Sequence, residues 1–325
     1  MAGAVSSPPD IAQPRMRARL QEPVSPLAVP ANRLGRASGG SISEKTKRMG
    51  AVAALLPGGR LHLQHGPIDI IAEAYGAPDL VRAGYARAAR RFSTLLEEVV
   101  TELPALRLPG QSVSGVVAQR MASAVAPFRP AFITPMAAVA GAVADEVLSA
   151  LQGPGIARAY VNNGGDIALW LAEGESLTCA LGLTWGADRV TIRACDRVRG
   201  IATSGWRGRS LSLGIADAVT VLARTAAMAD AAATMIANAV DIEDPGIVRR
   251  PAHALQADSD LCDRLVTVAV PELSVADRSQ VLAAGVQVAE RFRSRGLIEG
   301  AAVFLQGDRR MTGAMALAER ENAVV

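Results

Sequence analysis

Residues 157–171 read ARAYVNNGGDIALWL, two runs of strand-forming residues joined by the segment Asn162-Asn163-Gly164-Gly165-Asp166. Strand-like runs separated by asparagine and glycine predict two neighbouring strands. The glycines also permit positive φ and let the backbone approach a ligand, beside a carboxylate at the edge of the sheet. A ligand site and a plain hairpin turn both fit this segment, and the turn is the simpler interpretation.

More strand-like runs lie on either side of this segment, separated by Gly-rich or polar turns. Upstream, the run RLHLQHGPIDIIAE (60–73) is interrupted by Gly66-Pro67, which suits two short strands. The other runs are LTCALGLTW (177–185), RVTIRAC (189–195), DAVTVLA (217–223), a strand at 265–270 and a strand near 302–306. This pattern predicts a mostly antiparallel sheet.

Helical patterns occupy five segments: 79–103, 114–126, 134–151, 226–239 and 274–295. We expect Thr134 to cap the third of these, with Pro135 in its first turn. That helix has a face of small residues, which allows close backbone packing and makes a homodimer a candidate: Ala137, Ala140, Gly141 and Ala144. The sequence therefore predicts one α+β domain over 49–325, a mostly antiparallel sheet packed by long helices.

Residues 1–48 differ from the rest of the chain in composition and charge. They hold six prolines and no hydrophobic period, which predicts a disordered tail, either an interaction arm or the product of a misassigned start codon. The tail carries a net charge of +5, which leaves −2 for residues 49–325. A basic face for nucleic acid is therefore not expected on the folded domain.

Lysine is nearly absent, since Lys45 and Lys47 are the only two and both lie in the tail. This excludes a Schiff-base, P-loop or kinase-type lysine from the folded domain. Three cysteines without CxxC spacing and three histidines do not predict a zinc cluster, and they favour a reducing compartment. Residues 131–144 form an apolar run too short for the ~20 residues of a membrane span. With no signal-peptide pattern, we expect a cytoplasmic protein without membrane partners.

A second cluster of polar residues lies at a strand end and in the loop that follows it. Thr203-Ser204-Gly205 is followed by Arg207 and Arg209. Hydroxyls, backbone amides and guanidinium groups together suit an anionic ligand such as a phosphate. A solvated loop is the alternative interpretation.

A third cluster lies on the helix at 226–239. Spacing of four places Asp230, Thr234 and Asn238 on one face, and oxygen ligands of this kind suit Mg²⁺. The alternative is that Asp230 caps a helix while Thr234 packs inside.

Taken in order, NNGGDI, ATSG and ADAAAT resemble the NxGGDI, TSG and ADAxAT signatures of the ApbE-like superfamily, whose best-known members are FAD:protein FMN transferases. TPMAAVAGAVADEV stands where that family has a Gly-Gly-Ile-Ala-Lys-Gly helix. The resemblance covers 61–238 and looks closest to an uncharacterised prokaryotic side branch. It implies an ApbE-like, T-fold-like body.

The resemblance also implies roles for matching residues. Asp230 and Thr234 correspond to the magnesium-binding pair, and Mg²⁺ and FAD or FMN are the implied cofactors. The flavin-nucleotide pocket corresponds to Asn163, Gly164, Gly165 and Asp166 with Thr203, Ser204 and Gly205. The implied partners are a small-molecule or nucleotide ligand and an acceptor flavoprotein.

Two departures from the family pattern are visible. The lysine of the family helix is absent, with Gly141 or Ala142 near its place, and residues 208–214 replace a histidine-containing segment. Arg207 and Arg209 could substitute for that segment electrostatically but not as proton acceptors.

Other groups that could carry chemistry are His62, His65, Asp69, Asp145 and Asp217. His62 and His65 could serve as a base or as metal ligands if the chain turns there, but along a strand their spacing puts them on opposite faces. His65, Asp166 and Asp230 are the catalytic candidates.

Three functions follow. The first is an ApbE-like enzyme that uses Mg²⁺ to transfer or hydrolyse a flavin or another phosphorylated nucleotide. The second keeps the fold but catalyses a different small-molecule reaction without flavin. The third is a non-catalytic assembly protein of the same shape.

Overall fold

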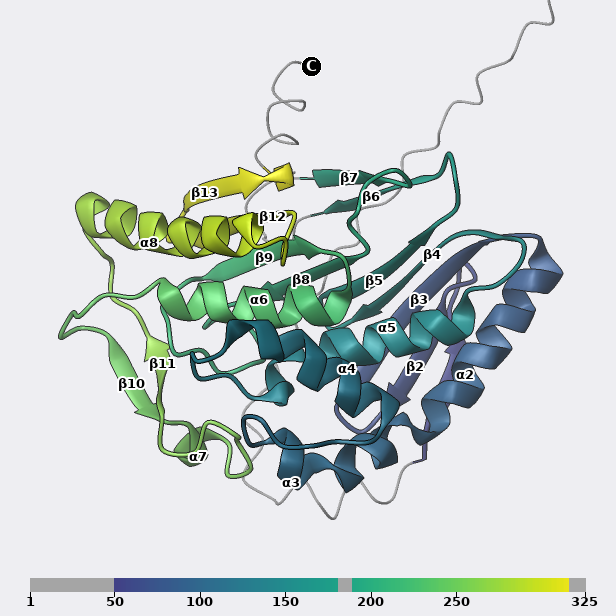
Figure 1. The fold of residues 1–325 in the computed structure, drawn as a ribbon, viewed down its shortest axis with the longest axis horizontal. Coiled ribbons are helices and arrows are strands. Elements are labelled where there is room, and N and C mark those ends of the chain that lie inside the picture. The colour runs from purple at the N-terminus through teal and green to yellow at the C-terminus, as the bar shows by residue number, and fades with distance from the viewer. Residues whose placement is uncertain (1–49, 181–188, 316–325) are drawn as a thin grey trace, which may run out of the picture.

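A computed structural model describes residues 50–180 and 189–315, so the expected disorder of residues 1–48 lies outside the described residues. The described chain is built around a nine-stranded sheet of order β1-β2-β3-β4-β5-β8-β9-β12-β13 (Figure 1). Each neighbouring pair in this sheet is antiparallel. The predicted antiparallel sheet is therefore confirmed.

The strands of the large sheet are β1 (Val52–Leu55), β2 (Leu61–His65), β3 (Ile68–Gly76), β4 (Ile156–Asn163), β5 (Asp166–Leu171), β8 (Gly200–Ser204), β9 (Ala218–Ala223), β12 (Gly300–Leu305) and β13 (Asp308–Gly313). Two hairpin sheets accompany it: β6 (Ser176–Ala180) with β7 (Arg189–Arg193), and β10 (Val248–Pro251) with β11 (Leu265–Ala269). The predicted run 177–185 continues past β6 into residues outside the described part.

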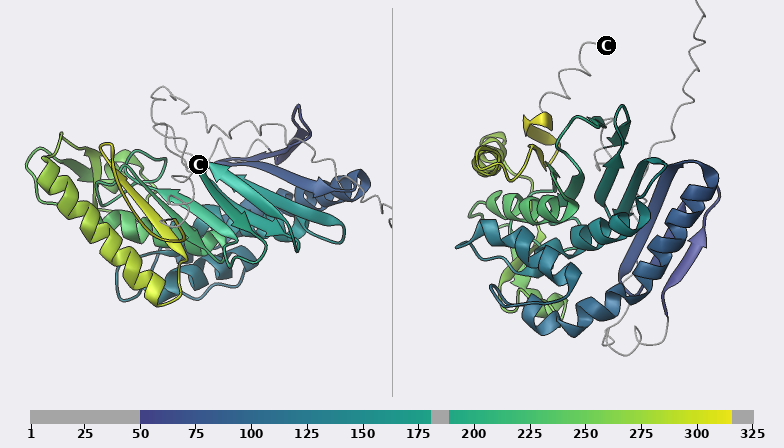
Figure 2. Two further views of the ribbon diagram at one scale, coloured as in Figure 1. Left: turned by 90° about the horizontal axis from the view of Figure 1, so that it is seen from above. Right: turned by 45° about the vertical axis from the view of Figure 1, so that its right-hand side comes forward.

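The long helices gather on one face of the large sheet, as the views in Figures 1 and 2 show. They are α2 (Pro78–Thr101), α4 (Val116–Val125), α5 (Val139–Leu151), α6 (Ala226–Ala239) and α8 (Val275–Ser294). All five predicted helices are present. Shorter elements are α3 (Leu103–Leu106), α7 (Ala252–Leu255) and the 3-10 turns η1 (Ala126–Phe128) and η2 (Pro135–Ala138).

The expectation that the Thr134 side chain caps a helix is wrong. Thr134 does occupy the N-cap position of η2, but its side chain accepts no capping hydrogen bond. Its hydroxyl instead donates to the carboxylate of Asp260, 126 residues further along the chain. The Thr134 hydroxyl, which the local sequence pattern predicted to cap the helix, therefore makes a tertiary contact.

Two apolar cores lie on the two faces of the large sheet. The larger lies between the sheet and the helices and is made mostly of Ala, Val, Leu and Ile, with Phe92 and Met121 among its few large members. The smaller contains Leu169, Ile192 and Phe304 and includes side chains from the β6–β7 hairpin. Alternation along the strands supplies both, because successive side chains point to opposite faces.

The small-residue face of α5 packs inside the chain. Gly141 and Ala144 are buried, and a Cβ at position 141 would lie 2.3 Å from the backbone oxygen of Ala226 on α6. Glycine is therefore required where the two helices cross. This face gives no support to a homodimer, because α6 covers part of it.

Among the described residues, no helix combines the length and the apolar character needed to cross a membrane.

Candidate functional site

The segment between β4 and β5 is a hairpin turn that also places Asp166 at the edge of the sheet. Gly164 and Gly165 have φ of 68° and 119°, a region that favours glycine. The Gly165 amide donates to Asn162 Oδ1 at 2.9 Å, which closes the turn. The turn and the ligand site were alternatives in the sequence, but the structure allows both.

Asp166 joins this turn to the end of β8. Its Oδ1 accepts a hydrogen bond from the Thr203 amide at 3.2 Å. Along β5, Asp166 shares the helix-facing side with Ala168. The Thr203 side chain alternates to the other face, where its hydroxyl lies 2.9 Å from that of Thr220. Thr203 therefore contributes its backbone amide to the site, while its predicted hydroxyl lies elsewhere.

Asp230 reaches the same place from α6. Its Oδ2 accepts from the Gly141 amide at 3.1 Å. The Asp166 charge acts directly on Asp230. The three clusters singled out in the sequence thus converge at the N-terminus of α5, with two carboxylates close together.

The environment disfavours the charged form of both carboxylates. Burial raises the pKa of Asp166 to about 7, against the opposing effects of the Thr203 amide and the Arg209 charge. Burial, followed by the negative charge of Asp166, raises the pKa of Asp230 well above its ordinary value. A divalent cation would relieve both effects, because it replaces lost hydration and screens the two like charges.

The donor set fits Mg²⁺ better than a metal that needs a cage of protein ligands. The described residues contain no group of three or more His, Cys, Asp or Glu side chains placed to hold a metal. Mg²⁺ is typically bound through one or two carboxylates and completes its shell with water and ligand phosphate. Thr234 lies one turn beyond Asp230 on α6, whereas Asn238 is engaged elsewhere, with its Oδ1 3.1 Å from the Leu213 amide.

Arg209 brings a positive charge to the site. Its Nη2 donates to the Pro67 carbonyl at 3.1 Å, and its Nη1 lies 3.0 Å from where a Cβ on Gly164 would be. Its charge also lowers the pKa of Asp166. The exposed guanidinium therefore stands beside the glycine turn, between the β2–β3 hairpin and Asp166.

Arg207 lies in the same loop but serves a different contact. Its Nε donates to Asp217 Oδ1 at 2.6 Å, and its guanidinium stacks 4.6 Å from the centre of the Trp206 ring. Asp217 also accepts from the Trp206 indole and the Gln306 amide. Asp217 thus organises the base of the loop.

The remaining predicted residues lie around this centre. Asn163 is buried, and its Nδ2 donates to the Ala140 carbonyl at 3.1 Å, so it ties β4 to the first turn of α5. Ser204, half-buried, alternates to the helix-facing side next to Thr203. Gly205 packs against the backbone of Asp217.

His65 is buried at the end of β2, on the helix-facing side. Its ring makes an edge contact with Phe92, and its Nε2 lies 3.4 Å from Glu97 Oε1. Its Nδ1 has no hydrogen-bond partner among the residues that the structure describes. His62 lies on the opposite face, paired with Asp69 at 2.7 Å, as the strand spacing predicted. A catalytic role for His65 stays a prediction.

Sequence reasoning missed the contribution of the α5 backbone. The Gly141 amide donates to Asp230, but the sequence does not show which backbone amides donate, only the small residues that let α6 approach. The Pro67 carbonyl that holds Arg209 was missed too, because 142 residues separate the two.

The raised pKa of Asp166 predicts how metal-free stability depends on pH. With a folded pKa of about 7, the folded chain retains a proton that the unfolded chain loses near pH 4. The contribution of Asp166 to stability should therefore fall as pH rises from about 4 to about 7, by at most about 1.4 kcal/mol per pH unit. We expect Asp166→Asn to flatten this slope in urea unfolding measured without divalent cations. An unchanged slope would show that the group titrates normally.

A family model described as AbpE bacteria matches residues 53–311, which include the converging segments. The chain belongs to the AbpE bacteria family. The ApbE-like resemblance of its motifs is thereby confirmed. The chain is 32% identical over 216 residues to a UPF0280 protein of Methanothermobacter thermautotrophicus, covering 61% of this chain and 77% of that protein.

A second relative of this AbpE bacteria chain is a UPF0280 protein of Methanopyrus kandleri, 33% identical over 202 residues, covering 57% of this chain and 76% of that protein. Among solved structures, the apo form of the flavinyl transferase ApbE of Pseudomonas stutzeri aligns with a TM-score of 0.35 and 15% identity, over 83% of this chain and 96% of that one.

Proposed function

We propose that this protein binds a flavin nucleotide or another phosphorylated small molecule together with Mg²⁺, and transfers or hydrolyses its phosphorylated part. The observation that carries the proposal is the convergence of Asp166 and Asp230, from two separate motifs, at the N-terminus of α5. Arg209 adds a cation beside the glycine turn. Paired carboxylates next to an exposed guanidinium suit a cation and an anionic phosphate bound side by side.

Each residue has a distinct role in this proposal. Asp230 and Thr234 would hold the cation, which supplies neutralisation of the charge on a pyrophosphate. Arg209 would donate hydrogen bonds to phosphate oxygens, and Gly164 and Gly165 would let the ligand approach the backbone. Asp166 would act as the general base, accepting a proton at its carboxylate.

One observation favours a reaction that differs from standard flavin transfer. The family lysine has no counterpart here, and a Cβ on Gly141 would already collide with the α6 backbone. Ala142 is fully buried. Neither position has room for a lysine, so a reaction of a non-flavin phosphorylated ligand at the same carboxylates is the second candidate. An acceptor flavoprotein is a partner only under the first.

Titration of the purified chain with FAD, FMN and ADP, with and without Mg²⁺, tests the proposal. We expect Mg²⁺-dependent binding of at least one of them. Arg209→Gln should weaken it about tenfold, since a charge-assisted hydrogen bond contributes roughly 1.5 kcal/mol or more. Arg129→Gln, which changes an arginine outside the site, is the control. Absence of binding by the wild-type chain to all three ligands would refute the proposal.

A further inference from the structure

Asp145 on α5 makes a contact that mirrors the one made by Asp230. Its Oδ1 accepts from the Ala226 amide and its Oδ2 from the Ala227 amide, each at 3.0 Å. These are the first two residues of α6. The Asp145 carboxylate, which is 9% exposed, therefore caps the helix that carries Asp230.

The two caps form a reciprocal pair. Asp145 lies four residues after Gly141 and binds the start of α6, whereas Asp230 lies four residues after Ala226 and binds the start of α5. Asp230 lies about one turn inside α6 and Asp145 nearly two turns inside α5, and each carboxylate reaches the N-terminus of the other helix. Both helix N-termini carry partial positive charge, which a carboxylate stabilises.

The α6 N-terminus depends on Asp145 for these two donors. The side chain of the residue at its own N-cap, Thr225, accepts from the Met228 amide at 3.1 Å, the amide next along the chain after the two that Asp145 binds. The first four amides of a helix have no partner within the helix. Asp145 satisfies two of them in a buried place, where an unmet donor costs about 1–3 kcal/mol.

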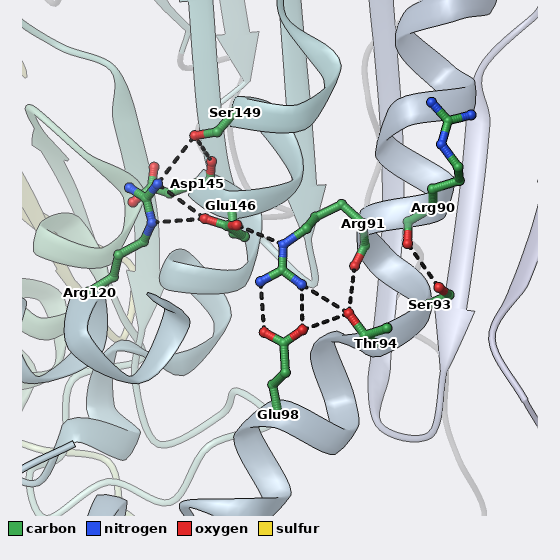
Figure 3. A network of polar contacts seen from close by, with 9 residues as sticks. All are labelled: Arg90, Arg91, Ser93, Thr94, Glu98, Arg120, Asp145, Glu146 and Ser149. Atoms are coloured by element: carbon green, nitrogen blue, oxygen red, sulfur yellow. Dashed lines mark hydrogen bonds and ion pairs between the residues drawn. The ribbon is translucent and has the colours of Figure 1, made fainter. Parts of the chain in front are cut away.

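A network of ion pairs fixes α5 itself (Figure 3). Glu146, next to Asp145, accepts from Arg91 on α2 at 2.8 Å and from Arg120 on α4 at 3.1 Å. Arg91 in turn forms a two-pronged pair with Glu98 at 2.6 and 2.7 Å. Glu146 therefore faces α2 and α4, whereas the Asp145 carboxylate one residue earlier faces α6.

We propose that Asp145 is a positioning residue for the candidate metal site. By binding the first two amides of α6, it sets where that helix starts and so where the Asp230 carboxylate meets Asp166. Loss of the Asp145 carboxylate lets the α6 N-terminus shift and displaces Asp230 from the Gly141 amide. This inference rests on the proposed function for its link to metal, but its structural part is measurable without a ligand.

Glu146→Gln is the matched control, because it changes a neighbouring buried carboxylate on the same helix that faces α2 and α4 instead of α6. Mn²⁺ binding to the full chain, followed by electron paramagnetic resonance, is compared for the wild type, Asp145→Ala, Asp145→Asn and Glu146→Gln. We expect about tenfold or greater weakening in Asp145→Ala, partial rescue in Asp145→Asn, which keeps one acceptor oxygen, and less than about twofold change in Glu146→Gln. Equal weakening in Asp145→Ala and Glu146→Gln, or none in either, would overturn the proposal.

Amide hydrogen exchange of Gly141, measured without metal, separates this proposal from the proposed function. Faster exchange at Gly141 in Asp145→Ala than in Glu146→Gln supports positioning of Asp230, even if the wild type binds no Mn²⁺ and the metal-dependent function is wrong. Unchanged exchange at Gly141 in Asp145→Ala would overturn the positioning role, whatever the wild type binds.

Discussion

Gly141→Ala is expected to destabilise the protein by about 3 kcal/mol, the upper part of the usual range for overpacked interiors. A Cβ at position 141 would lie 2.3 Å from the oxygen and 2.4 Å from the carbonyl carbon of Ala226, and 2.7 Å from the Ala227 nitrogen. All three are backbone atoms, so no side chain can rotate away. The helices α5 and α6 must separate, which lengthens the hydrogen bonds between Asp145 and the start of α6 and between Asp230 and the start of α5.

Urea unfolding at constant pH measures this loss, with Gly285→Ala on α8 as the control. Of the atoms near a Cβ on Gly285, only one, a side-chain methyl of Val240 at 2.5 Å, would lie closer than 3.0 Å, and alanine favours a helix by about 1 kcal/mol over glycine. We therefore expect a much smaller loss in the control. A cost for Gly141→Ala no larger than that for Gly285→Ala would contradict the close helix crossing.

Asp230→Asn is expected to weaken Mg²⁺-dependent ligand binding at least about 100-fold, roughly 3 kcal/mol. The change removes the negative charge that would bind the cation but keeps one oxygen for the Gly141 amide. It also removes a buried charge close to Asp166, so metal-free stability should be maintained or increased. Loss of binding would therefore not result from unfolding.

The control for this variant is Asp258→Asn, which changes an exposed carboxylate in the segment between α7 and β11. Calorimetric titration with Mg²⁺ and ADP should give wild-type affinity for Asp258→Asn. Wild-type affinity in Asp230→Asn as well would place the metal elsewhere.

Most of the sheet and the long helices could be predicted because their patterns are local. The run 226–239 is helical with the predicted bounds, and Gly66-Pro67 does separate β2 from β3. Strand β1 was not predicted, because its residues, VAAL, are all exposed and show no alternation. Strand β13 was not predicted either, because it begins with polar residues, two of them arginines, and three of its first four residues are exposed.

The candidate site was predictable as three segments but not as a set of contacts. Spacing placed Asp230 and Thr234 on one helix face, yet nothing local shows that Asp230 binds the start of α5, 89 residues earlier in the chain. The alternative that Asp230 caps a helix is correct, but the helix that it caps is α5 and not its own. Asn238 was predicted on the same face, but its side-chain oxygen accepts from the Leu213 amide and so is engaged away from the candidate metal site.

The most direct test of the central claim is ³¹P NMR of FAD bound to the protein while Mn²⁺ replaces Mg²⁺. The claim is that Asp166, Asp230 and Arg209 hold a cation and a phosphorylated ligand in one place. It predicts strong broadening of the bound phosphate signals by Mn²⁺ in the wild type and its loss in Asp230→Asn. Phosphate signals that stay sharp in the wild type, or broaden equally in Asp230→Asn, would contradict it.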